Sequence, residues 1–257
     1  MAILDELVLN KGVIFGDNAE PLTDIYGVSA TAKYLLGTKL IFGDGREFRY
    51  SRAGGAIGKA LMSQQAVVDT KLTEIVQTGH AQAVGATDIN VLITTGATLV
   101  DDELAGGFLF FNQSTTGDTL GDIYKIVASK LRATDTILDL KLETPIRNLV
   151  DVDNEMSIIP NRQSNVVVYP TAATGAASGV ALVDVADNEY FWAQVTGPAP
   201  IIVDTAETVI LGDSVGSAAA TAVAGTCGVR VTLEGIWGNV MAVGLAAEPA
   251  LINVKLT

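Results

Sequence analysis

The stretch Thr136-Ile-Leu-Asp-Leu-Lys-Leu-Glu143 indicates the fold class of this chain most directly. Its three leucines alternate with Asp139, Lys141 and Glu143, so in an extended chain the leucines share one face and the charged residues share the other. This is the pattern of a strand that is buried on one side only. Residues 229–234 and 252–256 alternate in the same way and predict two further strands.

Short apolar runs and closely spaced turns extend this pattern along the chain. The runs that predict strands are 89–93, 107–111, 165–169, 190–195 and 200–203. Turn residues occur at Gly43-Asp44-Gly45, Gly106-Gly107, Thr116-Gly117-Asp118, Gly197-Pro198 and Leu211-Gly212-Asp213. We therefore predict an all-β fold, a sandwich or barrel of short strands joined by short turns. At most one or two short helices are expected, within 29–36 and 57–76, where Gly58 and several β-branched residues weaken the helical pattern.

Length and composition set the expected domain organisation. The chain has 257 residues, of which 49% are hydrophobic, and this is sufficient for one large all-β domain or two smaller ones. Changes in composition predict an N-terminal β region with a basic strand (1–75), a central β region (76–162) and an acidic C-terminal β region rich in Ala, Gly and Thr (163–257). A single domain that contains all three regions is the alternative.

The charge and hydropathy of the chain argue against several classes of function. With 29 acidic and 16 basic residues the net charge is -13, so we expect no nucleic-acid partner and no anionic membrane surface as a partner. The long uncharged stretches, 163–183 and 214–229, consist mostly of small residues and lack the roughly 20 strongly apolar residues of a membrane-spanning helix. Asp5 and Glu6 stand where a secretory signal carries basic residues, so no export signal is expected.

The residue inventory predicts no metal and no cofactor. One histidine and one cysteine cannot form the clusters that zinc and iron centres need. Residues 151–155 resemble the start of a calcium loop, but Met156 and Arg162 occupy the positions of its turn glycine and closing glutamate. A calcium ion held by two loop carboxylates is the alternative. The glycine-rich segment 54–60 lacks the residues of a phosphate loop, and Cys227 is expected to be a small buried residue.

One motif is compatible with catalysis by a serine. Gly212-Asp213-Ser214-Val215-Gly216 fits the pattern of a nucleophile elbow, and His80 followed by an acid such as Asp101 or Asp102 completes the order found in chymotrypsin-like proteases. However, the residue after Ser214 and the surroundings of His80 both differ from those of such proteases. We therefore predict that the protein is not an enzyme and that Ser214 follows an ordinary Gly-Asp turn. A serine hydrolase that uses Ser214 and His80 is the less favoured alternative.

Basic residues are concentrated in the first part of the chain. Residues 33 to 71 hold seven of the 16 basic residues, whereas residues 163 to 229 hold six acidic residues and no basic one. This asymmetry predicts an electropositive and an electronegative surface that meet across neighbouring subunits. Ordinary solvated faces are the alternative.

Within this basic part, segment 43–59 predicts a strand at a protein interface. Because Arg and Tyr are enriched at interfaces, this strand is expected to contact another protein. The residues expected at the interface are Arg46, Phe48, Arg49, Tyr50 and Arg52. Alternation places Arg49 on one face and the other four on the opposite face. The competing interpretation is a local strand whose arginines pair with Asp44 and Glu47 and contribute little.

Three segments resemble structural proteins of tailed bacteriophages, of the head decoration or cement type common in marine phages. They are LLGTKLIFGDGREFRYSRAGGAIGKALMSQ (35–64), TDTILDLKLETPIRNLVDVDNEMSIIPNRQSNVVVYP (134–170) and NEYFWAQVTGPAPIIVD (188–204). The resemblance implies a mainly β, non-enzymatic protein that forms homo-oligomers, often trimers. It also implies that the protein is made in the cytoplasm of the bacterial host and binds the major capsid protein on the outer surface of the virion. No set of functional residues comes with this resemblance.

Other functions stay open at this point. A tail or fibre protein that contacts a host receptor is the second interpretation, and a carbohydrate-binding or surface-layer module is a further one. Trp192 and Trp237 are each expected to be core or strand-edge residues, with a platform for carbohydrate as the alternative.

Overall fold

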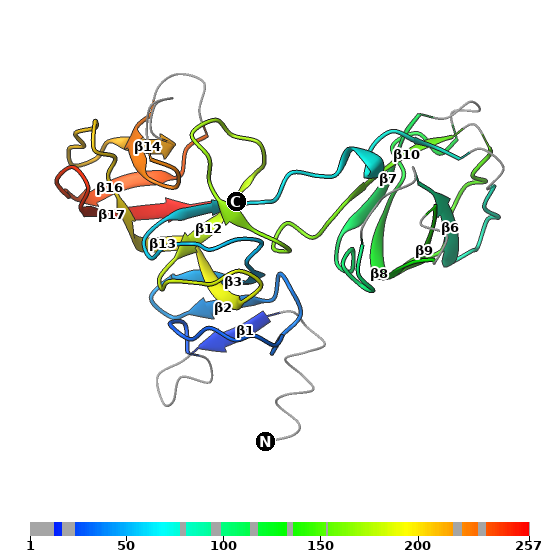
Figure 1. Ribbon diagram of the computed structural model, residues 1–257, viewed down its shortest axis with the longest axis horizontal. Helices are drawn as coiled ribbons and strands as arrows, with labels where there is room; N and C mark the ends of the chain where they lie inside the picture. Colours follow the sequence, from blue (N-terminus) through cyan, green and yellow to red (C-terminus); the bar gives the residue numbers. More distant parts are fainter. Residues whose placement is uncertain are drawn as a thin grey trace. The chain divides into compact units, whose positions relative to one another are not determined.

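The computed structural model divides the chain into two units (Figure 1). Unit 1 comprises Met1–Val67 and Arg162–Thr257, and unit 2 comprises Val68–Asn161. The structure describes residues 13–16 (backbone only), 24–77, 81–93, 99–113, 118–132, 136–152, 154–217, 223–230 and 235–256. Residues 68–75, which the composition places in the N-terminal region, belong to unit 2.

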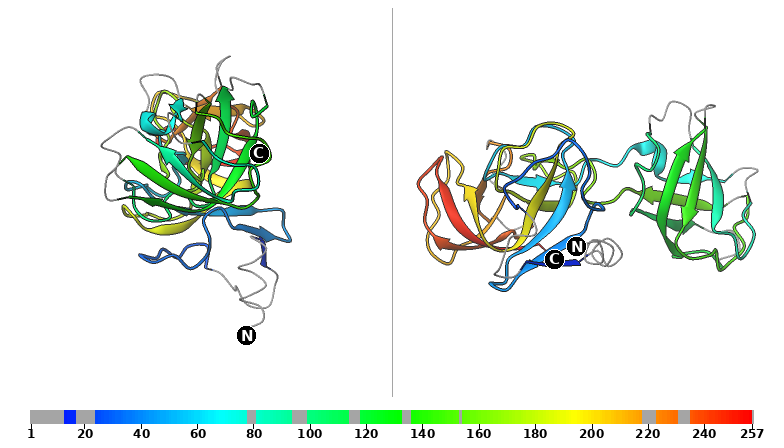
Figure 2. Two further views of the ribbon diagram at one scale, coloured as in Figure 1. Left: turned by 90° about the vertical axis from the view of Figure 1, so that its right-hand side faces the viewer. Right: turned by 90° about the horizontal axis from the view of Figure 1, so that it is seen from below.

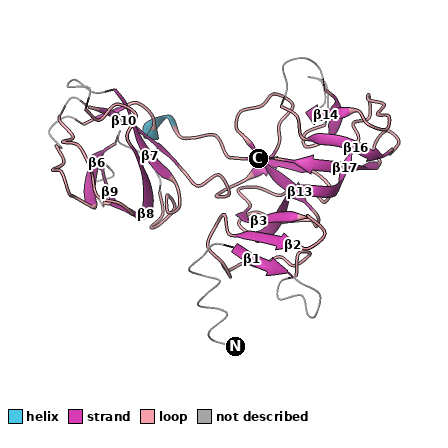
Figure 3. Ribbon diagram, turned by 180° about the vertical axis from the view of Figure 1, so that it is seen from behind, coloured by secondary structure: helices cyan, strands magenta, loops and turns pink. Residues whose placement is uncertain are grey.

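Strands dominate both units, and the predicted all-β fold is confirmed (Figure 3). In the described part of the chain the only helix is a single 3-10 turn, η1 (Thr70–Leu72), whose first turn is closed by Asp69 accepting a hydrogen bond from the backbone N–H of Lys71 at 3.0 Å. The helix considered at 29–36 does not form: these residues are bends and turns, and Ser29 bonds to Tyr190 as an isolated bridge. No described helix is long and apolar enough to cross a membrane.

Unit 1 contains an eleven-stranded sheet in which β1-β2-β3-β13-β17-β16-β14-β15 are successive neighbours. Strand β12 pairs with β13 and β4, and β4 also pairs with β11. The strands are β1 (Val13–Gly16), β2 (Lys39–Phe42), β3 (Glu47–Arg52), β4 (Met62–Gln64), β11 (Val167–Val168), β12 (Ala177–Ala181), β13 (Tyr190–Ile202), β14 (Ser214–Ser217), β15 (Cys227–Val229), β16 (Gly238–Ala242) and β17 (Pro249–Lys255). The pairing of β3 with β13 joins the two chain segments of this unit.

Strand β13 corrects the expectation of two short strands separated by a turn at Gly197-Pro198. It runs continuously from Tyr190 to Ile202, with an irregularity in its pairing with β3 between Gln194 and Thr196. Gln194 Nε2 donates hydrogen bonds to the carbonyls of Thr196 and Pro198, at 3.1 and 2.9 Å. Gly197 has a φ of 88°, and a Cβ there would approach Arg46 Cα to 3.1 Å, so glycine permits this bend without ending the strand.

Both faces of the sheet of unit 1 are covered around β13. Trp192 packs in the larger cluster with Phe48 and Trp237, whereas its neighbours Phe191 and Ala193 pack in a second cluster on the opposite face. Alternation along β13 therefore distributes side chains between two apolar layers, with no exposed face at this point.

Unit 2 is a six-stranded antiparallel sheet in the order β5-β10-β7-β8-β9-β6, which curls on itself (Figure 2). Its strands are β5 (Ile75–Val76), β6 (Asp88–Leu92), β7 (Phe108–Gln113), β8 (Ile123–Leu131), β9 (Ile137–Leu142) and β10 (Glu155–Ile159). The alternation seen in 136–143 is confirmed, because Leu138, Leu140 and Leu142 are at most 2% exposed inside the curl. The charged residues of β9 are turned to its other side.

Candidate functional site

The strand expected at a protein interface is β3, which lies between β2 and β13. Phe48 and Tyr50 are 0% and 2% exposed and belong to the core of unit 1. The expectation that they contact another protein is therefore corrected: Tyr34 and Trp192 cover Tyr50, with ring centroids 5.2 and 5.1 Å away. Alternation placed both aromatics on one face correctly, but that face is turned into the core.

Two of the arginines on this segment have partners within the chain. Arg46 Nε contacts Asp44 Oδ2 at 2.7 Å, and the backbone N–H and side chain of Arg46 hold the pKa of Asp44 below its ordinary value. Arg52 Nη2 donates to Asn188 Oδ1 at 2.6 Å. The alternative expectation, that the arginines pair with Asp44 and Glu47, therefore holds for Arg46 and Asp44. Glu47 instead pairs with Lys39, with Lys39 Nζ 2.8 Å from Glu47 Oε2.

Arg49 differs because its side chain bonds to a backbone carbonyl and forms no ion pair with a described carboxylate. Its Nη1 donates to the carbonyl of Gly37 at 2.9 Å. The guanidinium of Arg162 donates a hydrogen bond to the carbonyl of Ala177. The pKa of Arg162 is lowered, mainly by burial and secondly by the positive charge of Arg49. None of the ion pairs among the described residues includes Arg49 or Arg162. We name Arg49 and Arg162 the arginine site: each guanidinium bonds to a backbone carbonyl, and neither forms an ion pair with a described carboxylate.

The proposed nucleophile, Ser214, lies at the start of β14 after a closed turn. Asp213 Oδ2 accepts a hydrogen bond from the backbone N–H of Ile210 at 2.9 Å, and Asn239 Nδ2 donates to Ser214 Oγ at 3.1 Å. In the described residues no imidazole or carboxylate bonds to Ser214 Oγ. His80 lies outside the described residues, so the pairing of Ser214 with His80 is not tested.

The tryptophans and the cysteine are core residues. Trp192 and Trp237 are 3% and 1% exposed, which confirms the expected core position, so neither indole ring is itself an exposed platform for carbohydrate. Cys227 is fully buried, and burial raises the pKa of its thiol to about 12. The thiol is therefore neutral at physiological pH and has the low reactivity of a structural cysteine.

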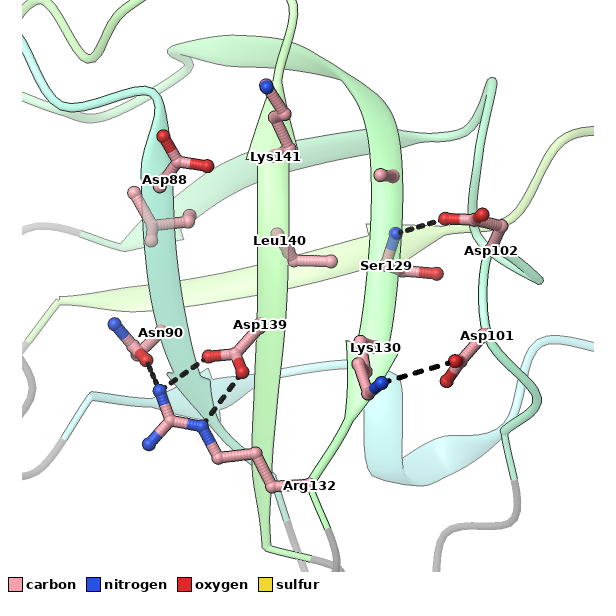
Figure 4. Close-up of a pocket in the computed structure, with 12 residues that line it drawn as sticks. Asp88, Asn90, Asp101, Asp102, Ser129, Lys130, Arg132, Asp139, Leu140 and Lys141 are labelled. Atoms are coloured by element: carbon pink, nitrogen blue, oxygen red, sulfur yellow. Dashed lines mark hydrogen bonds and ion pairs between the residues drawn. The ribbon is translucent and has the colours of Figure 1, made fainter.

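A charged groove of about 530 Å³ on unit 2 was not identified from the sequence (Figure 4). Arg132 contacts both carboxylate oxygens of Asp139, at 2.7 and 2.8 Å, and also bonds to Asn90. Lys130 pairs with Asp101 at 3.4 Å. The charged side chains of the groove thus largely compensate one another, as expected for a solvated face.

The described residues offer no metal centre. No group of three histidine, cysteine, aspartate or glutamate residues among them could hold a metal ion. In the loop that resembles the start of a calcium site, Asp151 Oδ1 accepts a hydrogen bond from the backbone N–H of Val152 at 2.7 Å. Asp153 lies outside the described residues.

Two neighbouring segments of unit 1, the turn 210–213 and β16 with the residues that follow it, carry exposed apolar side chains. We name as the hairpin patch five side chains that are 49–70% exposed: Ile210, Leu211, Met241, Val243 and Leu245. The turn at 210–213 lies beside β16, because Gly212 N–H bonds to Val240 O at 3.0 Å and Val240 N–H bonds to Asp213 O at 2.9 Å. Clustered apolar exposure of this kind marks an interaction surface more often than scattered single residues do.

No family model, curated protein or solved structure matches the chain.

Proposed function

We propose that the chain is a decoration, or cement, protein of a bacteriophage head, which self-associates as a homotrimer and binds the major capsid protein on the outer surface of the virion. The observation that carries this proposal is the hairpin patch. Five large apolar side chains exposed to this extent on two adjacent segments favour a surface that a second protein covers. The proposed role is structural, so the protein needs no cofactor and performs no reaction.

Charge supports a second contact, separate from the hairpin patch. The arginine site places two guanidinium groups close together in a chain of net charge -13. Guanidinium groups that form no ion pair with a carboxylate among the described residues are suited to an acidic partner, because Arg binds carboxylates with two parallel hydrogen bonds. In this proposal the hairpin patch joins subunits and the arginine site binds the shell.

Self-association through the hairpin patch predicts that polar substitutions in this patch lower the mass of the assembly in solution. The variant Leu211→Ser/Met241→Ser/Leu245→Ser should sediment as a monomer where the unmodified protein sediments as a trimer, since three apolar contacts are lost per interface. Analytical ultracentrifugation over a range of concentrations measures this. Leu35→Ser, at a leucine that is 64% exposed elsewhere in unit 1, is the matched control and should remain a trimer. An unmodified protein that is monomeric throughout would contradict the proposal.

Binding of the capsid shell through the arginine site predicts that charge reversal at this site weakens the affinity for phage heads. Arg49→Glu/Arg162→Glu should weaken cosedimentation with undecorated heads of the encoding phage by at least about tenfold, because it places negative charge against an acidic partner. Lys59→Glu, at another exposed basic residue of unit 1, is the control. Circular dichroism checks that each variant is folded. Equal binding by all three proteins would exclude this surface as the contact with the shell.

A further inference from the structure

Unit 1 contains a pocket of about 350 Å³ that the proposed function does not use. It lies between the loop 24–34 and the paired strands β3 and β13. Its lining includes four aromatic side chains, with one acidic and one basic residue: Tyr34, Tyr50, Tyr190, Trp192, Asp24 and Lys33. This volume is at the lower end of the range for small-molecule sites, about 300–1,000 Å³.

The aromatic residues form one continuous wall. Tyr50 and Trp192 lie directly opposite each other in the β3–β13 register, with ring centroids 5.1 Å apart. Tyr34 packs 5.3 Å from Trp192, and Tyr190 is stacked on Tyr50 at 5.8 Å with an interplanar angle of 13°. Tyr50 and Trp192 are buried, whereas Tyr34 and Tyr190 are only half-buried. The latter two rings are therefore the ones that a ligand can reach.

The loop that closes the pocket is held in place by its own hydrogen bonds. Ser29 and Tyr190 exchange two backbone hydrogen bonds, at 3.0 and 2.8 Å. The backbone N–H of Lys33 donates to the Tyr50 hydroxyl at 3.0 Å. Asp24 Oδ1 accepts from the backbone N–H of Tyr26 at 2.9 Å. The pocket is thus formed before any ligand arrives, which reduces the entropy that binding must overcome.

The polar groups of the lining select the class of ligand. The Asp24 carboxylate only accepts hydrogen bonds, and the Lys33 ammonium only donates them. Neighbouring hydroxyls on a sugar ring both donate and accept, and the apolar C–H face of such a ring can pack on an aromatic side chain. We propose that this pocket binds the pyranose ring of a neutral glycan, with the ring against Tyr34 and Tyr190 and its hydroxyls toward Asp24 and Lys33.

Two other ligands of aromatic pockets fit less well. A quaternary ammonium group gains from ring faces, but Lys33 places a positive charge in the same pocket. A nucleotide carries phosphates, and the net charge of -13 opposes its approach. This inference does not depend on the hairpin patch or on capsid binding, because every residue of the pocket lies outside those surfaces.

Tryptophan fluorescence tests the site directly. The chain has two tryptophans, so Trp237→Phe leaves Trp192 as the only one and makes its emission a reporter of the pocket. A glycan array, followed by titration with methyl glycosides of glucose, galactose and mannose and with N-acetylglucosamine, should give a saturable change in that emission for at least one sugar. Tyr190→Ala and Tyr34→Ala should each weaken binding by about tenfold, as expected for the loss of one aromatic contact.

Two further variants separate binding from folding. Asp24→Asn keeps an oxygen that can accept from Tyr26 N–H but removes the charge, so it should weaken sugar binding while the melting temperature is retained. Tyr26→Ala, at a tyrosine that is 59% exposed on the same loop and does not line the pocket, should leave affinity unchanged. A failure of every array glycan and glycoside to give a saturable response would overturn the proposal. Saturation by choline or adenosine monophosphate in place of a sugar would do the same.

Discussion

Phe48→Ala is expected to lower the free energy of unfolding of unit 1 by about 3–5 kcal/mol, the usual cost of removing a large aromatic side chain from a packed core. Phe48 is fully buried, lies opposite Leu40 on β2 and Gln194 on β13, and packs edge-to-face on Phe42 with centroids 5.6 Å apart. Urea unfolding followed by tryptophan fluorescence measures this effect, because both tryptophans belong to unit 1.

Arg46→Ala provides the control, since it lies just before the same strand. Its contact with Asp44 is exposed to solvent, so the change should cost less than about 1 kcal/mol. If Arg46→Ala lowered the free energy of unfolding as much as Phe48→Ala does, the assignment of Phe48 to the core and of Arg46 to the surface would be wrong.

Asp204→Ala should cost roughly 2–4 kcal/mol, because it removes a buried carboxylate that accepts three hydrogen bonds, and hydrogen bonds to a charged group are among the stronger ones. Asp204 is 1% exposed. Its carboxylate accepts from the backbone N–H groups of Ala206 and Val223, at 2.9 and 2.8 Å, and from the Thr226 hydroxyl at 3.1 Å. These bonds hold the segment around Thr226 against the end of β13. Urea unfolding at neutral pH measures the loss.

The same carboxylate predicts a dependence on pH. Burial by itself raises the pKa of Asp204, but the hydrogen bonds that it accepts outweigh burial and bring the pKa below its ordinary value. A lowered pKa in the folded state means that this stabilisation is complete above the unfolded value of about 3.9 and is lost as pH falls through the folded value. The difference in free energy of unfolding between the unmodified protein and Asp204→Asn should therefore be constant near neutral pH and shrink below about pH 4. A difference that does not change with pH would show that the charge of Asp204 is not involved.

The sequence predicts those strands that are buried on one side. In β9, charged and apolar residues alternate, so both the element and its inner face could be identified. In β3 the same reasoning identified the strand and grouped Phe48 with Tyr50, but it could not tell that this face is internal. Around β3 and the first half of β13 both sides of the sheet are covered, so the contrast between an exposed and a buried face is weak there.

Features that depend on distant segments could not be predicted. The aromatic pocket brings together Tyr34, Tyr50 and Tyr190, which are widely separated in the sequence and show no common spacing. The arginine site depends on Arg49 meeting Arg162 for the same reason. The hairpin patch was missed because exposed apolar residues in a strand-rich chain look like core residues until the neighbouring strands are known.

The path of the chain through unit 1 bears on how such a protein changes over evolution. Unit 2 is inserted between β4 and β11, and these two strands are direct partners, with Gln64 opposite Val167. The chain thus leaves and re-enters the larger sheet at adjacent positions, so the register of that sheet does not depend on what lies between them. We therefore expect this junction to tolerate exchange of the inserted domain. Recombination that replaces unit 2 by another domain, or by a short peptide linker between β4 and β11, should leave the fold of unit 1 intact.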